Sequence, residues 1–193
     1  MSYVFTDEKK QEIRKNIIEI AIDLSKTIGL KKMNIETISK KAGISTGSFY
    51  TFFDSKEKLV IELINELEIH SLKKIEEYLK NQDKIPLETF IKIYRDFFKP
   101  ENNFLLCLKL EDWVWLKTHI KDQDYFNNIT DIEKIKNTIS YIQGIKKDID
   151  LGVVINFIKS IYSMYQNKET FFEESLETNI DMIFDTIYRY VKE

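Results

Sequence analysis

The chain has 193 residues, of which 43% are hydrophobic and 32% charged, a composition that excludes an intrinsically disordered protein. Five glycines and two prolines are too few for a many-turned β architecture, and the single cysteine, Cys107, excludes an internal disulfide. The net charge of −3 excludes a uniformly basic surface, so any strongly basic region must be local.

The first predicted helix follows Thr6, whose side chain can accept a hydrogen bond from the first turn. Apolar residues recur every three or four positions from Ile13 to Ile28, which predicts an amphipathic helix. Gly29 is placed to end this helix in the left-handed conformation. The basic residues near its start are interpreted as a solvated face.

Residues 34–59 predict two short helical segments around an Ala-Gly pair. Asn34 and Ser45 are the N-cap candidates of the two segments, and Gly43 breaks the first. The phenylalanines of the second segment are interpreted as core of a three-helix head: Phe49, Phe52 and Phe53. Ser55 then caps a long helix that runs to about residue 80 and joins this head to the rest of the chain.

The remainder of the chain is also predicted to be helical. Pro86 is placed in the first turn of a helix, and residues 104–120 are apolar almost all round, as in a buried central helix. Capping-box patterns begin at Thr130 and Thr170, and Asp148 or Asp150 opens another helix between them. We therefore expect an all-α fold of about nine helices without a convincing strand.

Residues 45–51 have the composition of a helix that reads DNA. Their small donors and acceptors could approach base edges, and Gly47 would let the backbone come close. Tyr50 has a hydroxyl that can reach a phosphate, and Lys56 lies where the exposed N–H groups of a helix start also favour an anion.

The charge distribution agrees with a DNA-facing head. Residues 1–60 contain 11 basic and 8 acidic residues, a net charge of +3, whereas residues 61–193 contain 18 and 24, a net charge of −6. An acidic body of this kind would not bind DNA by itself.

Residues 8–68 resemble the DNA-binding domain of the tetracycline-repressor (TetR) family. The resemblance rests on the first helix with Gly29 behind it, the turn at 42–45, the Phe49-Tyr50 pair and the start of the long helix at 55–59. It implies a DNA-binding domain at 1–54 and an effector-binding and dimerisation domain at 55–193.

Carried onto this sequence, the resemblance implies phosphate contacts from Asn34, Thr46, Tyr50 and Lys56, and base-edge positions at 47, 48 and 51. Met33 and Phe52 depart from the family pattern, so one or two phosphate contacts are expected to be missing. The candidate DNA-binding residues are Asn34, Ser45, Thr46, Gly47, Ser48, Tyr50, Thr51 and Lys56.

The last two predicted helices are apolar on more than one side, which predicts a second surface to be buried. Two such helices from each of two chains would form a four-helix interface, as the family resemblance also implies, and the alternative is a larger monomeric core. The candidate interface residues are Gly152, Asn156, Ser160, Ser163, Leu176, Ile180, Ile183 and Ile187.

The predicted central helix supplies most candidates for a ligand pocket. A buried carboxylate near a tryptophan could recognise a cationic aromatic ligand by charge pairing and cation–π contact. In the alternative, the tryptophans are core and the carboxylates are exposed or pair with Lys109 and Lys117. The candidates are Phe97, Cys107, Glu111, Asp112, Trp113, Trp115, His119 and Tyr125.

No pattern in the sequence indicates catalysis. His70 and His119 are the only histidines and lie far apart, and no Gly-rich phosphate loop is present, so we expect no enzyme, metal or cofactor. The absence of a signal-like or membrane-spanning apolar run predicts a cytoplasmic protein.

Together these features predict a homodimeric transcriptional regulator, a repressor, that binds a palindromic operator in double-stranded DNA and is released by a small-molecule effector. The rival interpretation is a helical ligand-binding or protein-interaction module that does not bind DNA.

Overall fold

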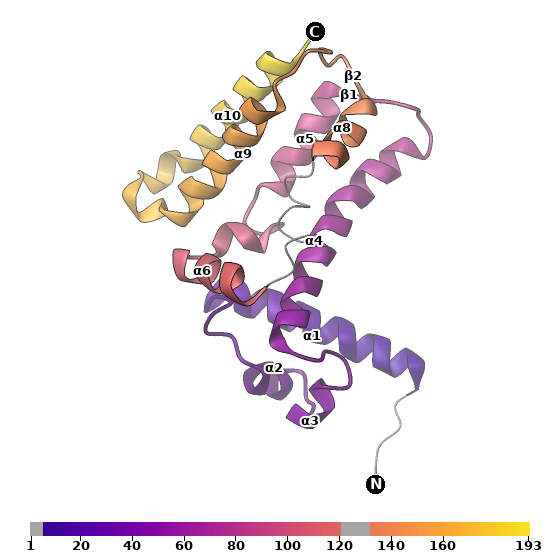
Figure 1. Ribbon diagram of the computed structural model, residues 1–193, viewed down its shortest axis with the longest axis vertical. Helices are drawn as coiled ribbons and strands as arrows, with labels where there is room; N and C mark the ends of the chain where they lie inside the picture. Colours follow the sequence, from indigo (N-terminus) through magenta and orange to yellow (C-terminus); the bar gives the residue numbers. More distant parts are fainter. Residues whose placement is uncertain (1–5, 121–131) are drawn as a thin grey trace. The chain divides into compact units, whose positions relative to one another are not determined.

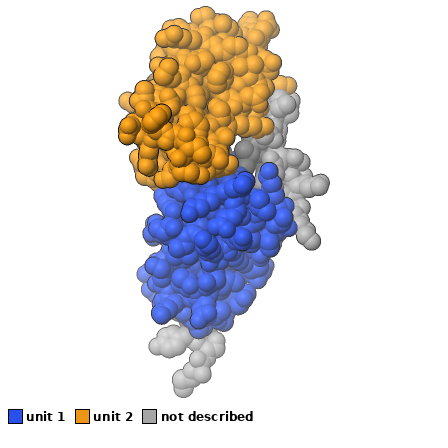
Figure 2. Space-filling model, turned by 90° about the vertical axis from the view of Figure 1, so that its left-hand side faces the viewer, with its two compact units in different colours: residues 1–68, 107–121 blue, residues 69–106, 122–193 orange. Residues whose placement is uncertain are grey.

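The computed structural model describes residues 6–120 and 132–193. Within these residues the chain forms nine α-helices, three short 3-10 helices and two strands of two residues each (Figure 1). The all-α prediction is confirmed. The chain divides into two compact units: unit 1 comprises residues 1–68 and 107–121, and unit 2 comprises residues 69–106 and 122–193 (Figure 2).

Unit 1 contains three complete helices at its start, the first half of a long fourth helix and a helix from later in the chain. These are α1 (Asp7–Thr27), α2 (Ile35–Lys41), α3 (Thr46–Phe49), α4 (Lys56–Leu79, to residue 68) and α6 (Leu110–His119). This unit is larger than the expected 1–54 module, because it takes in the start of α4 and the whole of α6.

The core of unit 1 forms where the apolar stripe of α1 meets α4 and α3. Ile17, Leu63 and Phe49 are fully buried, as the periodicity of the first helix predicts. Arg14 of α1 pairs with Glu62 of α4 at 2.8 Å, and its guanidinium lies 5.1 Å from the ring centroid of Phe53. These contacts fix the long helix against the head.

Unit 2 contains the second half of α4 and the elements that follow, apart from α6. Its helices and strands are β1 (Ile85–Pro86), α5 (Leu87–Phe97), the 3-10 turn that begins at Phe104, α8 (Ile132–Ser140), β2 (Ile142–Gln143), α9 (Leu151–Gln166), two 3-10 turns (Lys168–Thr170 and Glu173–Ser175) and α10 (Leu176–Val191). Its core is built chiefly by α5, α9 and α10, which bury Ile91, Ile161 and Phe184. The helices α9 and α10 lie side by side (Figure 1).

Two short strands, which the sequence did not predict, join segments far apart in unit 2. Ile85 pairs in parallel with Ile142, and the N–H of Ile85 donates to the carbonyl of Tyr141 at 2.8 Å. Ile145 forms an antiparallel bridge with Lys192 near the C-terminal end of α10. Such short pairings have no hydrophobic period that a sequence could display.

Two helix predictions are wrong in their extent. Residues 104–120 form a 3-10 turn over Phe104–Cys107 and then α6, and Leu110 and Val114 are 70% and 54% exposed, so this segment is not one buried helix. The last helix begins at Leu176 instead of following Thr170, because two 3-10 turns intervene.

The core of unit 2 predicts a contrast between two isoleucines. Ile161→Ala should lower the free energy of unfolding by about 2–5 kcal/mol, because Ile161 is completely buried and the change leaves a cavity. Ile69→Ala, on an α4 residue that is 56% exposed, should change it by about 0.5 kcal/mol or less. Urea unfolding followed by circular dichroism measures both, and equal losses would contradict this packing.

Candidate nucleic-acid interface

The segment from α2 to α3 is a helix-turn-helix built by local hydrogen bonds. The Asn34 side chain accepts from the N–H of Thr37 at 2.8 Å and begins α2, and Ser45 accepts from the N–H of Ser48 at 3.0 Å and begins α3. Between them Gly43 adopts a φ of +69°, a value that favours glycine. The caps predicted at Asn34 and Ser45 are therefore present.

One side of this motif is buried and the other is polar and exposed. Ile38 and Phe49 are fully buried and Phe53 is buried, and the ring centroids of Phe49 and Phe53 are 5.7 Å apart. The interpretation of these two phenylalanines as core is confirmed, whereas Phe52 is half-buried. Tyr50, by contrast, is 52% exposed, with its ring edge-on to Phe49. The two neighbouring aromatic residues thus point to opposite sides of the head.

The predicted DNA-binding residues are solvent-accessible to different degrees. Ser48 and Lys56 are half-buried. The exposed members are Asn34, Ser45, Thr46, Gly47, Tyr50 and Thr51.

Several hydroxyls on this exposed side are held in place by one another. The Ser45 and Ser48 hydroxyl oxygens are 2.8 Å apart, and the Thr51 hydroxyl donates to the carbonyl of Ser48 at 2.7 Å. These bonds orient short side chains in and around α3 before any partner arrives.

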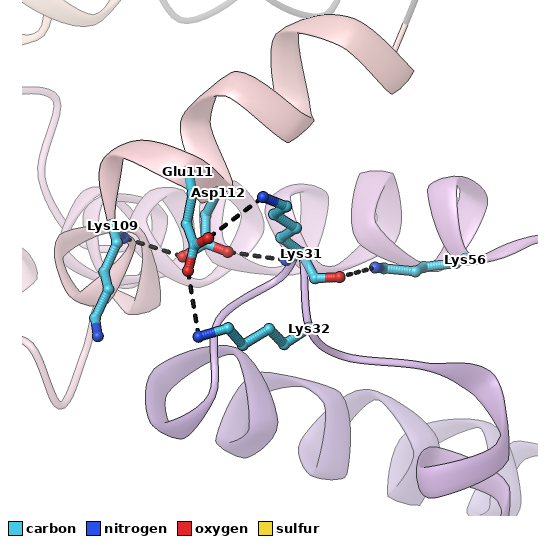
Figure 3. A network of polar contacts seen from close by, with 6 residues as sticks. All are labelled: Lys31, Lys32, Lys56, Lys109, Glu111 and Asp112. Atoms are coloured by element: carbon cyan, nitrogen blue, oxygen red, sulfur yellow. Dashed lines mark hydrogen bonds and ion pairs between the residues drawn. The ribbon is translucent and has the colours of Figure 1, made fainter.

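The helix α6 is fastened to the head by a buried carboxylate. Asp112 is only 2% exposed; its Oδ1 accepts from the N–H of Lys31 at 2.8 Å, and its Oδ2 accepts from the N–H of Lys109 at 3.0 Å (Figure 3). These two bonds satisfy a charge that would otherwise be costly to bury. Asp112 and Lys31, which the first of these bonds joins, lie 81 positions apart in the chain.

Gly29 makes room for this carboxylate. Its φ is +85°, and a Cβ at this position would lie 2.7 Å from both oxygens of Asp112. Gly29 therefore ends α1 in the left-handed conformation, as the sequence predicts, and also permits the close approach of α6, which the sequence does not reveal.

The neighbouring carboxylate faces two lysines of the same loop. Glu111 lies 3.4 Å from the ammonium groups of both Lys31 and Lys32 (Figure 3). The hydrogen bond from Lys31, followed by the charge of Lys32, lowers the pKa of Glu111 below its ordinary value. Because these groups are exposed, the pairs add little stability, but they place a negative charge beside the head.

Lys56 also contacts α6. Its Nζ donates to the carbonyl of Lys31 at 3.1 Å and lies 4.2 Å from the ring centroid of Trp115, whose ring stacks on His119 at a centroid distance of 4.8 Å. Burial lowers the pKa of Lys56, although the nearby charges of Glu57 and Asp112 act in the opposite direction.

The pocket candidates are therefore divided between the units. Those on α6 belong to unit 1, where Asp112, Glu111 and Trp115 already contact groups of the head; Trp113 is half-buried. Cys107 is half-buried immediately before α6, and Phe97 lies on α5 in unit 2. Tyr125 lies outside the described residues, as does Thr130, a predicted capping residue.

The interface candidates on α10 are mostly internal to unit 2. Leu176, Ile180 and Ile187 are buried in its core, and Ile183 is half-buried. On α9 the four candidates are more accessible: Gly152, Asn156 and Ser163 are exposed and Ser160 is half-buried. The accessible apolar residues near and on α10 instead include Phe172 and Met182, 81% and 62% exposed.

Two further features concern the described residues as a whole. In these parts of the chain, no group of three or more His, Cys, Asp or Glu side chains is arranged to hold a metal ion. No helix among the same residues has both the length and the apolar character needed to cross a membrane.

Comparison with known proteins agrees with this geometry. Residues 17–63 match the model of the family described as bacterial regulatory proteins, tetR family. The α2–α3 segment and the exposed polar side of α3 therefore agree with a helix-turn-helix of this family. The helix-turn-helix part of the chain is thus of the TetR type.

Sequence relatives occur in Bacillus subtilis (strain 168). The uncharacterized HTH-type transcriptional regulator YerO is 29% identical over 179 residues, which are 88% of this chain and 59% of YerO. The uncharacterized HTH-type transcriptional regulator YvdT is 39% identical over 59 residues, 31% of this chain and 30% of YvdT. The chain thus spans less than two thirds of the length of these relatives.

The fold is shared with solved structures of low sequence identity. A TetR-family regulator from Agrobacterium tumefaciens matches with a TM-score of 0.64 and 18% identity, over 95% of this chain and 100% of that one. A putative TetR-family regulator from Rhodococcus sp. matches with a TM-score of 0.64 and 13% identity, over 94% and 100%. At these identities the likeness concerns the fold.

The contact between Gly29 and Asp112 predicts a difference between two glycines that both have positive φ. Gly43→Ala should cost about 1–2 kcal/mol of unfolding free energy from backbone strain alone, because the space beside its Cβ position is open. Gly29→Ala should cost about 1–3 kcal/mol more, because the new methyl group meets the carboxylate. Urea unfolding measures both values.

An Asp112→Ala background provides the control for this prediction. There the extra cost of Gly29→Ala should largely disappear, while the cost of Gly43→Ala should stay the same. Equal costs for the two glycine variants in the parent protein would contradict the close contact.

Proposed function

We propose that this protein is a ligand-responsive transcriptional repressor that binds a palindromic operator as a homodimer through residues 34–56. The observation that carries the proposal is the exposed polar side of α3, whose opposite side is anchored in the core by Phe49. A helix that enters a DNA groove needs this division between an anchored side and a polar one.

Gly47 supports close contact between α3 and another molecule. Its φ is not positive, and a Cβ at this position would make only an ordinary contact of 3.8 Å with the Ser45 hydroxyl. Packing within the chain therefore does not require glycine here. A DNA backbone or base edge that approaches closely would supply such a requirement.

Phosphate and base contacts are proposed for different side chains. Tyr50 presents an exposed hydroxyl, and the Asn34 oxygen caps α2 while its amide nitrogen can donate to a phosphate. Thr46 would share this role. The base-edge positions proposed are Ser48 and Thr51, whose hydroxyls are oriented by their neighbours.

Dimerisation is proposed through the outer sides of α9 and α10. The exposed Gly152, Asn156 and Ser163 would let a second chain approach α9 closely, and Met182 and Phe172 offer apolar area to bury. A two-fold dimer would place two copies of α3 in successive major grooves of a palindromic site.

The effector would act by linkage. A small molecule that prefers the conformation with lower operator affinity must weaken DNA binding, and DNA must weaken its binding in return. The contacts of α6 with the loop at Gly29–Lys32 and with Lys56 give one route by which a change in α6 reaches the head.

DNA binding is tested by salt titration of a duplex selected by the protein from a random-sequence library. The dissociation constant should rise steeply between about 50 and 200 mM salt as phosphate contacts release counterions. Tyr50→Phe should weaken binding to every sequence, whereas Thr51→Val should alter sequence preference. Lys159→Met, an exposed residue of α9, is the matched surface control and should have little effect.

The rival module that does not bind DNA predicts the opposite outcome. Binding that is undetectable, or that stays constant across this salt range, would contradict the proposed function.

The dimer is tested by placing charge on its proposed surface. Met182→Lys should shift the protein from dimer to monomer at micromolar concentration, because a lysine would be buried without a partner. Val114→Lys, a similarly exposed apolar position on α6, should leave the dimer intact. Sedimentation velocity distinguishes the two, and a parent protein that is already monomeric would refute the dimer.

A further inference from the structure

The ammonium group of Lys56 occupies a defined position made by two other segments of unit 1. It donates to the carbonyl of Lys31 in the α1–α2 loop at 3.1 Å, as Figure 3 shows, and it lies 4.2 Å from the ring centroid of Trp115 on α6. Trp115 is itself nearly buried and is stacked on His119. A long flexible side chain at the first turn of α4 is thus held in one place.

The two groups in direct contact with the Lys56 ammonium attract a cation, and neither of them carries a full charge. A carbonyl oxygen and the face of an indole ring both carry partial negative charge, but neither is an anion. The ammonium is also partly desolvated, since burial lowers its pKa. The charges of Glu57 and Asp112 lie near enough to act on the pKa of Lys56, but the two groups in direct contact with its ammonium are neutral, so this oriented, half-buried cation is suited to bind an anion on its accessible side.

We propose that Trp115 is a positioning residue for DNA binding, which holds the Lys56 ammonium where an operator phosphate completes its set of contacts. The inference rests on the proposed function and adds a way in which α6 regulates DNA binding at the same site. Operator affinity then depends on the placement of α6 through a single cation–π contact.

Lys58 provides an internal comparison. It lies two residues along the same helix, is exposed, and carries the same charge. Loss of Lys58 therefore changes the net charge near the start of α4 as much as loss of Lys56 does, but it does not disturb the position beside Trp115.

The experiment measures binding to the library-selected duplex as a function of salt for the full chain. Lys56→Met and Trp115→Leu should each weaken binding roughly tenfold at about 0.1 M salt and lower the slope of log K against log salt by about 0.9, the value of one phosphate contact. The double variant should bind like either single variant, because both remove the same contact. Trp115→Phe retains an aromatic face and should restore most of the affinity.

Thermal unfolding of each variant by circular dichroism shows whether it remains folded, and Trp115→Phe keeps the test decisive if Trp115→Leu does not fold. Lys58→Met should lower the DNA affinity measurably further when it is combined with Trp115→Phe or Trp115→Leu, because its effect does not depend on the contact between Lys56 and Trp115.

Three outcomes would overturn the inference. Trp115→Leu could leave DNA affinity unchanged, its loss of affinity could add fully to that of Lys56→Met, or it could bind DNA more tightly than the parent protein. The last would mean that Trp115 withholds Lys56 from DNA. Failure of the proposed function is distinguishable, because the parent protein itself would then show no salt-dependent binding.

Discussion

The burial of one carboxylate determines how unit 1 is built beyond its helix-turn-helix. Asp112 lies at the third residue of α6, where the helix dipole favours a negative charge, and both of its oxygens accept backbone N–H groups. Removing either donor would leave a buried charge incompletely satisfied. Because Glu111 and Trp115 project from the same helix, their contacts with Lys31, Lys32 and Lys56 depend on this anchor.

Local features of the head could be predicted from the sequence because their causes act within a few residues. The caps at Thr6, Asn34 and Ser45 each bond to an N–H three positions later, and the glycines at 29 and 43 have the positive φ expected where a helix ends. The helical fold class follows from the same signals. The final helix was misplaced because a capping pattern at Thr170 does not distinguish an α-helix from successive 3-10 turns.

Long-range contacts could not be predicted in the same way. A carboxylate and an indole on one helix are chemically suited to cations, and that much can be read from the sequence. In the structure the cations that they contact are Lys31, Lys32 and Lys56 of the same chain, about 60 to 80 residues earlier. The spacing of residues along the sequence does not show which distant residues come into contact. The apolar residues Leu110 and Val114 led to the wrong prediction of a buried helix over 104–120, since an apolar residue need not be buried.

The bonds from Asp112 to main-chain amides have a consequence for how such a protein can diversify. An amide N–H is present whatever side chain follows it, proline excepted, so residues 31 and 109 can change without loosening the junction. The surface charges beside the head can therefore be exchanged while Gly29 and Asp112 stay fixed. Tolerance to substitution is thus found directly beside a junction whose own glycine and carboxylate cannot change.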